Sequence, residues 1–308
     1  MKSLAEVEFG LEAGDYPFES RFFECNAHRL HYIDEGTGSA IFFLHGNPSW
    51  SYMYRNVILG LRRDFRCIAV DLSGFGLSVP APGFTFLPSG QARLIAGLLD
   101  HLDLHEATLV AHDWGGPIGI AAMFGTPGRI TRLVLGNTWA WDVSGDWHFE
   151  WFSRLMGGAI GRWAANRFAI FVNVVMPTAM KRRKLTAVDM AAYRAPFQRH
   201  EARRPMHILP HEIIASGPWL RGLEDQLRGF KGEAFFIWPD SDIAFRAKEL
   251  ARWQTLLPQA QVRIIQQCGH FLWEDAPGEC IGLIREAMGL FADPAGHQNG
   301  QAAKAPAA

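Results

Sequence analysis

The sequence predicts an α/β fold in which a mostly parallel sheet of eight strands is covered by helices on both faces. Short apolar runs alternate with stretches of helical spacing before residue 137 and again after residue 223. This alternation is typical of strand–helix–strand units, which build parallel sheets. Residues 138–223 differ, because they are rich in Trp, Phe and Met and contain no convincing strand. A chain of 308 residues can hold one such domain and an insertion.

The expected strands are short apolar runs that end at turn residues. The first two are predicted to form a hairpin around Asn26. The eight runs are 21–25, 29–33, 40–44, 65–70, 106–111, 130–135, 234–238 and 261–266. The spacing of apolar residues predicts helices over 52–61, 91–102, 117–124, 247–257 and 278–291.

The helical stretch 138–223 is predicted to be a cap over the carboxyl ends of the strands, where α/β sheets keep their sites. A peripheral helical decoration is the alternative. The core is then formed by residues 1–137 and 224–292. Residues 293–308 have no apolar periodicity, so a disordered tail is expected there.

Composition narrows the class of protein. Hydrophobic residues make up 48% and charged residues 20%, as in globular proteins, and the net charge of −1 gives no sign of nucleic acid or a membrane surface as a partner. The first fourteen residues have no apolar signal region, and no stretch approaches the roughly 18 apolar residues of a spanning helix. The four cysteines lack metal-ligand spacing, so no metal is expected. We therefore expect a cytoplasmic protein, and the sequence leaves a homo-oligomer open.

A short strand-to-helix turn is the most informative local feature. In Ala111-His112-Asp113-Trp114-Gly115-Gly116, small residues flank a central acid. This is the pattern of a nucleophile elbow, with a carboxylate in place of the usual serine. A carboxylate can attack carbon directly and needs no base to activate it. The competing interpretation is that Asp113 only caps an ordinary helix.

An elbow nucleophile requires a histidine and an acid later in the chain, each just past a strand. His270 follows the 261–266 strand, and Gly269 provides the turn that presents it, so His270 is the predicted base. Asp240 and Asp242 both follow the 234–238 strand. Asp242 is predicted to be the acid because it ends the turn, and Asp240 is interpreted as a turn residue. Asn137, after the preceding strand, carries no charge that stabilises an imidazolium.

Two neutral donors are predicted near Asp113. The backbone N–H groups of Asn47 and Trp114 are expected to form an oxyanion hole. Their side chains, an amide and an indole, are expected to donate to a departing anion such as halide without neutralising Asp113. Taken singly, Asn47 would be a turn residue and Trp114 would pack in the core.

Four sequence blocks resemble the haloalkane dehalogenases: residues 45–52, 71–78, 112–119 and 135–139. The last block has Asn137 where another subgroup of the family has a catalytic Glu, and in this it resembles the third subclass. That subclass pairs an Asp-His-Asp triad with Asn and Trp as halide donors. The resemblance covers about residues 20–291 and implies an α/β-hydrolase fold. It implies hydrolysis of haloalkanes to alcohol, halide and proton through an alkyl-aspartate, without a cofactor. Pro239 departs from the pattern, since relatives usually have Gly there.

Three other functions share this elbow. The β-lactone decarboxylases of olefin synthesis are similar in most of the triad and donor pattern. For the dehalogenase interpretation, the expected partner is a small apolar halogenated substrate, with a halide ion as product. Epoxide hydrolases usually use two cap tyrosines, whereas residues 138–223 contain only Tyr193. A non-enzymatic protein of the same fold would normally lack one triad member, and here all three are present.

Overall fold

The computed structural model describes residues 4–12 and 14–292, and its centre is one eight-stranded sheet. The order across the sheet is β1-β2-β4-β3-β5-β6-β7-β8. The strands are β1 (Arg21–Cys25), β2 (His28–Glu35), β3 (Ala40–Leu44), β4 (Arg66–Val70), β5 (Ala107–His112), β6 (Ile130–Gly136), β7 (Glu233–Pro239) and β8 (Gln261–Ile265). All eight predicted strands are therefore present, most within one or two residues of the expected bounds.

The sheet is antiparallel at the edge formed by β1 and β2 and parallel elsewhere. β1 and β2 form the predicted hairpin, whose turn is tight because Asn26 and Ala27 both adopt positive φ. β2 is also antiparallel to β4, and every later pairing is parallel. All six residues of β5 are buried, as expected for a strand covered on both faces. The predicted fold class is confirmed.

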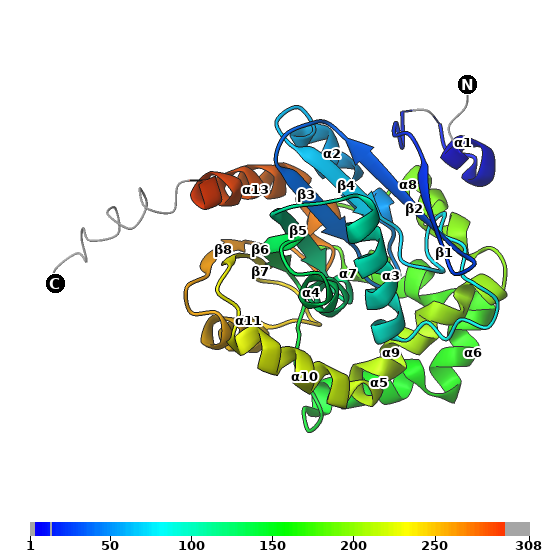
Figure 1. Ribbon diagram of the computed structural model, residues 1–308. Coiled ribbons are helices and arrows are strands. Elements are labelled where there is room, and N and C mark those ends of the chain that lie inside the picture. The colour runs from blue at the N-terminus through cyan, green and yellow to red at the C-terminus, as the bar shows by residue number, and fades with distance from the viewer. Residues whose placement is uncertain (1–3, 13, 293–308) are drawn as a thin grey trace.

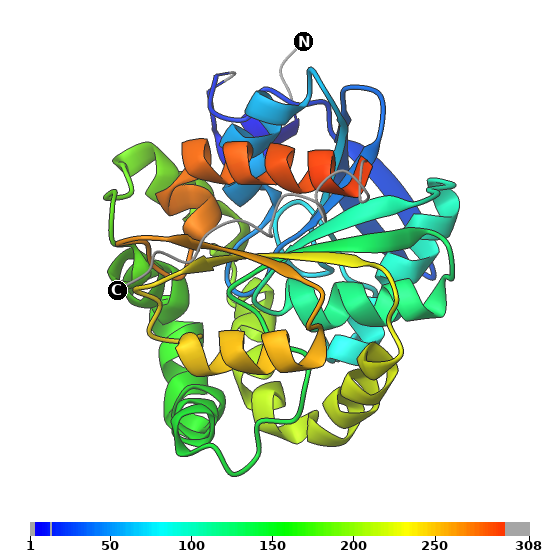
Figure 2. The ribbon, with the colours of Figure 1, turned by 90° about the vertical axis from the view of Figure 1, so that its left-hand side faces the viewer.

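Helices cover both faces of this sheet, as Figures 1 and 2 show. α2 and α13 pack against each other on one face, and α3, α4 and α11 lie on the other. Their bounds are α2 (Arg55–Leu61), α3 (Pro88–His101), α4 (Gly115–Gly125), α11 (Ala247–Leu256) and α13 (Pro277–Ala292). The helix predicted over 52–61 begins as the 3-10 turn η1 (Ser51–Tyr54) and continues as α2. Outside the insert, two short helices were not predicted: α1 (Leu4–Phe9) and α12 (Leu272–Asp275).

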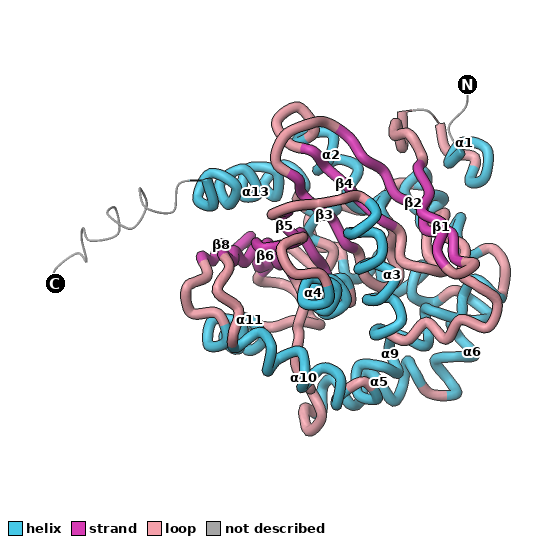
Figure 3. Tube along the Cα trace, viewed as in Figure 1, coloured by secondary structure: helices cyan, strands magenta, loops and turns pink. Residues whose placement is uncertain are grey.

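The segment between β6 and β7 is helical, and the tube in Figure 3 shows no strand within it. Its helices are α5 (Trp147–Gly157), α6 (Ala159–Phe168), the π-helix η2 (Phe171–Val175), α7 (Met176–Ala179), α8 (Ala187–Arg194), η3 (Ala195–Phe197), η4 (Glu201–Arg203), α9 (Arg204–Ala215) and α10 (Gly217–Arg228). α10 continues past residue 223 and packs on both α9 and α4. The boundary expected at 223/224 thus falls inside a helix. The tail expected at 293–308 lies outside the described residues.

No helix among the described residues is both long and apolar enough to cross a membrane.

A buried cluster of charges joins the helical insert to the sheet domain. The Arg55 guanidinium donates to Glu274 at 2.5 Å and to Asp189 at 2.6 Å. Arg183 pairs with the same two carboxylates, and the Tyr193 hydroxyl donates to Glu274 at 2.6 Å. Arg55 and Glu274 belong to the sheet domain, whereas the other three residues belong to the insert. Two positive and two negative charges balance within the cluster, so each carboxylate is buried with its countercharge.

Removing Arg55 should destabilise the protein strongly. Arg55→Met leaves two buried carboxylates short of a partner, and breaking a buried pair in this way typically costs about 3–5 kcal/mol. Arg154→Met is the matched control, because Arg154 pairs with Glu150 at an exposed position and such pairs contribute about 0.5 kcal/mol. Urea-induced unfolding followed by circular dichroism measures both free energies. Equal losses for the two variants would show that the cluster contributes no more than a surface ion pair.

Candidate active site

Asp113 occupies a sharp turn between β5 and α4. Its φ is 49°, a left-handed conformation that is strained for a residue with a side chain. A Cβ at Gly115 would lie 2.1 Å from the carbonyl oxygen of Leu44, and one at Gly116 would lie 1.9 Å from Thr138 Oγ1. Both glycines are needed for the turn to approach β3 and the loop after β6 this closely. This is the geometry of a nucleophile elbow.

Neighbouring backbone groups hold the elbow in place. The Asp113 N–H donates to the Asn137 carbonyl at 2.9 Å, and the Thr138 hydroxyl donates to the Asp113 carbonyl at 2.7 Å. Gly116 N–H donates to the same carbonyl at 3.1 Å. The strained residue is therefore fixed by three hydrogen bonds of its own main chain.

The Asp113 carboxylate is half-buried among neutral donors. The Asn47 N–H donates to Asp113 Oδ1 at 2.8 Å, and the Trp114 N–H also favours the charged form of the carboxylate. Burial raises the pKa of Asp113, while the nearby His270 and the two N–H groups oppose that rise. A Cβ at Gly46 would lie 2.2 Å from Oδ1, so only glycine lets this loop approach. The site thus solvates an ionised carboxylate without placing an arginine or lysine on it.

His270 and Asp242 are in direct contact, as expected for a base and its orienting acid. His270 Nδ1 lies 2.9 Å from Asp242 Oδ2, and the Ala244 N–H donates to the other carboxylate oxygen at 2.7 Å. Burial lowers the pKa of His270, but the charge of Asp242, its hydrogen bond and the charge of Asp113 outweigh that effect and raise it. Phe245 stacks on the His270 ring with centroids 5.7 Å apart.

Asp240, the alternative acid, lies apart from this pair. Its side chain is exposed and accepts a hydrogen bond from Ser241 at 2.7 Å. Such a contact is typical of the turn residue that the sequence predicted.

The two expected halide donors are both buried. The Asn47 amide reaches the Met206 carbonyl in α9 at 3.4 Å, a long hydrogen bond that occupies at most one of its two N–H groups. The Trp114 ring packs edge-to-face on Trp139, with centroids 4.7 Å apart. Among the described residues, no group accepts a hydrogen bond from the Trp114 indole N–H. Asn47 therefore retains at least one unused side-chain N–H group, and Trp114 retains its indole N–H.

Two further residues support His270 and were not predicted to do so. The Asn137 amide donates to the His270 carbonyl at 2.6 Å, and His112 Nε2 lies 2.9 Å from the same oxygen. The sequence shows that His112 precedes Asp113 and that Asn137 follows the 130–135 strand. It does not show that both side chains bond the carbonyl of His270, which lies more than 130 residues further along the chain. No group of three metal-ligating side chains occurs within the described ranges.

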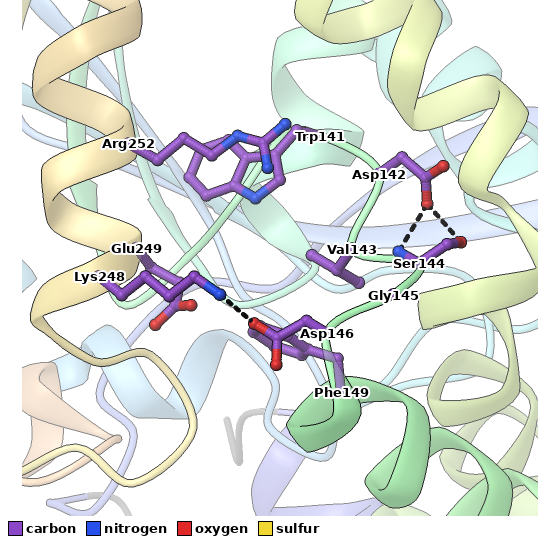
Figure 4. A pocket seen from close by; sticks show the side chains of 10 residues that line it. All are labelled: Trp141, Asp142, Val143, Ser144, Gly145, Asp146, Phe149, Lys248, Glu249 and Arg252. Atoms are coloured by element: carbon purple, nitrogen blue, oxygen red, sulfur yellow. Dashed lines mark hydrogen bonds and ion pairs between the residues drawn. The ribbon is translucent and has the colours of Figure 1, made fainter.

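A separate cavity of about 250 Å³ opens between α11 and the loop before α5 (Figure 4). Its charges are satisfied locally: Lys248 pairs with Asp146 at 2.8 Å, and Asp142 accepts from Ser144. Phe149 lines the cavity and packs on Phe245, which in turn stacks on His270. None of the five predicted site residues lines this cavity.

Comparison with known proteins agrees with this geometry. A family model described as the alpha/beta hydrolase fold matches residues 39–277. Haloalkane dehalogenase 2 of Mycobacterium tuberculosis is 37% identical over 286 residues, which cover 92% of this chain and 99% of that protein. The chain belongs to the haloalkane dehalogenase family.

Two further similarities are informative, one to a solved structure and one to a protein of different activity. A haloalkane dehalogenase loop variant from Bradyrhizobium elkanii superposes with a TM-score of 0.80 at 25% identity, covering 91% of this chain and 99% of that one. A cis-3-alkyl-4-alkyloxetan-2-one decarboxylase of Shewanella oneidensis is 32% identical, covering 88% of this chain and 89% of that protein. The expected resemblance and fold are thereby confirmed, and the oxetanone relative makes the β-lactone alternative worth a direct test.

The contact between Asp242 and His270 predicts a change in a measurable pKa. In Asp242→Asn the charge that raises the pKa of His270 is lost, so burial should dominate and the pKa should fall. Asp240→Asn should leave it unchanged. NMR titration of the histidine Cε1–H signals measures both, with the His270 signal assigned from its loss in His270→Ala. An unchanged pKa in Asp242→Asn would contradict the pairing.

Proposed function

We propose that this protein hydrolyses the carbon–halogen bond of small apolar haloalkanes, giving an alcohol, a halide ion and a proton. The observation that carries the proposal is the half-buried Asp113 carboxylate, strained at an elbow and contacted by neutral N–H donors. A carboxylate solvated in this way remains nucleophilic, whereas a cation in contact with it would quench its charge. Membership of the dehalogenase family supports the same conclusion.

In the first step, Asp113 attacks the carbon that bears the halogen. A C–O bond forms, the carbon–halogen bond breaks, and the halide leaves with the bonding pair. Side-chain N–H groups of Asn47 and Trp114 donate to the halide as its charge develops, which is where such donors contribute most to rate. The product of this step is an alkyl ester on Asp113.

In the second step, His270 removes a proton from a water molecule, which attacks the carbonyl carbon of the ester. The backbone N–H groups of Asn47 and Trp114 hold the oxyanion, and Asp242 stabilises the imidazolium. The bond between the carbonyl carbon and the alkyl oxygen then breaks, and the alcohol leaves with one of the two protons of the water. Asp113 regains its carboxylate, and His270 releases the other proton to solvent. Esterification also removes the Asp113 charge, which is one of the influences that raise the pKa of His270. The intermediate therefore favours the unprotonated histidine that its own hydrolysis needs.

The helical insert, residues 138–223, is proposed to be the cap of this site. Its α9 reaches Asn47 through the Met206 carbonyl, and the carbonyl of Ala179 in α7 accepts from the His270 N–H at 3.0 Å. Both contacts lie just past carboxyl ends of strands, β3 and β8.

The tyrosines argue against epoxide hydrolysis, which needs phenols that protonate the opening ring. Tyr193 donates to Glu274 inside the buried charge cluster, and Tyr52 donates to Asp189 there. Tyr54 donates to the Leu44 carbonyl and Tyr16 bonds Ser51. The fifth tyrosine, Tyr32, lies on β2 opposite Val70. The hydroxyl groups of the first four tyrosines therefore all have hydrogen-bond partners other than a substrate.

Incubation with a panel of one to eight-carbon bromoalkanes, an epoxide and a β-lactone tests the function. We expect halide release from at least one bromoalkane and little turnover of the epoxide or lactone. Trp114→Leu should lower the rate of halide release about 100-fold or more, as loss of one transition-state donor does elsewhere, while its backbone N–H stays in place. Opening of the lactone without any halide release would contradict the proposal and favour the β-lactone decarboxylase alternative.

Lowering the pH should stop the two steps at different points. Bond cleavage needs ionised Asp113 and is lost as the pH falls through the pKa of Asp113, which is raised from 3.8. Ester hydrolysis needs neutral His270 and is lost as the pH falls through the higher pKa of His270. At mildly acidic pH we therefore expect a halide burst of about one per site with little steady turnover. Rapid-quench measurements follow both phases, and parallel loss of burst and turnover would contradict the two assignments.

A further inference from the structure

The Asp275 carboxylate has a set of partners that the reaction scheme leaves unused. This buried side chain accepts four hydrogen bonds, and all four donors are main-chain N–H groups. Oδ2 accepts from Gly269 at 2.8 Å and from Lys181 at 2.9 Å. Oδ1 accepts from Arg182 at 2.8 Å and from Arg183 at 3.0 Å. One carboxylate thus joins the residue before His270 to the insert segment that follows α7.

The same two segments touch directly. The His270 N–H donates to the Ala179 carbonyl at 3.0 Å, and a Cβ at Gly269 would lie 2.0 Å from that oxygen. The loop that carries His270 therefore rests on residues 179–183 through its backbone, with no room for a side chain at Gly269. The four bonds to the Asp275 carboxylate add to this contact, and such charge-assisted hydrogen bonds are roughly twice as strong as neutral ones.

Glu274 fixes the helix from which Asp275 projects. It is the preceding residue in α12 and binds Arg55, Arg183 and Tyr193 within the buried charge cluster. α12 is thereby attached both to the sheet domain, through Arg55, and to the insert. Asp275 is held at a defined place relative to both.

We propose that Asp275 is a positioning residue for His270, acting through Gly269 and the 179–183 segment. The proposal rests on the proposed function, in which only ester hydrolysis uses His270. Asp242 orients the imidazole of His270 by its contact with Nδ1. The distance from Nε2 to the ester on Asp113, however, is set by the position of the loop backbone that carries His270. A displacement of about 1 Å in such a group can cost about 100-fold in rate. Asp275 therefore controls the second step and leaves the first unaffected.

Asp275→Asn tests this, because the amide keeps one acceptor but turns its NH₂ toward two backbone donors. Rapid-quench halide release measures bond cleavage, and intact-protein mass spectrometry measures the alkyl-enzyme. We expect cleavage within about twofold of the parent, hydrolysis slower by about 10–100-fold, and alkyl-enzyme that accumulates. Glu279→Gln is the matched control: it removes a carboxylate that pairs with the Arg182 side chain but leaves the four N–H contacts intact. It should change neither step.

Other outcomes overturn the proposal. Equal slowing of both steps, or unchanged hydrolysis in folded Asp275→Asn, would leave Asp275 as a structural anchor only. If that variant does not fold, Lys181→Pro deletes a single donor, and the extended backbone of Met180 tolerates a following proline. The same selective loss of hydrolysis is then expected, and its absence counts against the proposal. Failure of the proposed function is distinguished by the parent, which would then show no halide burst at all.

Discussion

An ionised carboxylate that is half-buried must be stabilised without being neutralised, and much of the structure around Asp113 follows from this constraint. Backbone N–H groups meet it, because they are dipoles rather than countercharges. They act only at hydrogen-bonding distance, so the loop after β3 must lie against the elbow, and Gly46 makes that approach possible. The strain at Asp113 and the two glycines that follow it are consequences of the same demand.

The protein handles the two carboxylates of the buried charge cluster in the opposite way. Glu274 and Asp189 are each paired with arginines, in a cluster whose charges balance. Arginine forks are well suited to that purpose, because they saturate the carboxylate oxygens and fix two segments relative to each other. Carboxylates are thus stabilised in two ways: by arginines in the cluster that joins the insert to the sheet domain, and by main-chain N–H groups at Asp113 and Asp275.

The sheet and the linear motifs could be predicted from the sequence, since they depend on local patterns. Apolar runs located every strand, and the small residues around Asp113 indicated the elbow. The contacts of Arg55 could not be predicted, because its partners lie 134 and 219 residues away and any of many acids could have filled those positions. The four bonds to Asp275 were equally hidden, since backbone donors have no signature in sequence. The position of Asp242 beside His270 could be anticipated because a turn after a strand has few geometries.

Recognition through the main chain has a consequence for how this protein can diverge. At residues 181–183, Asp275 accepts from the main-chain N–H groups, so that contact does not constrain the identities of those side chains. Lys181 and Arg182 could be exchanged for most other amino acids over generations without disturbing the carboxylate. An insertion or deletion there would shift every donor out of register at once. Related chains should therefore vary in composition at positions 181 and 182 while keeping the length of this stretch, whereas Arg183 is constrained by the buried charge cluster.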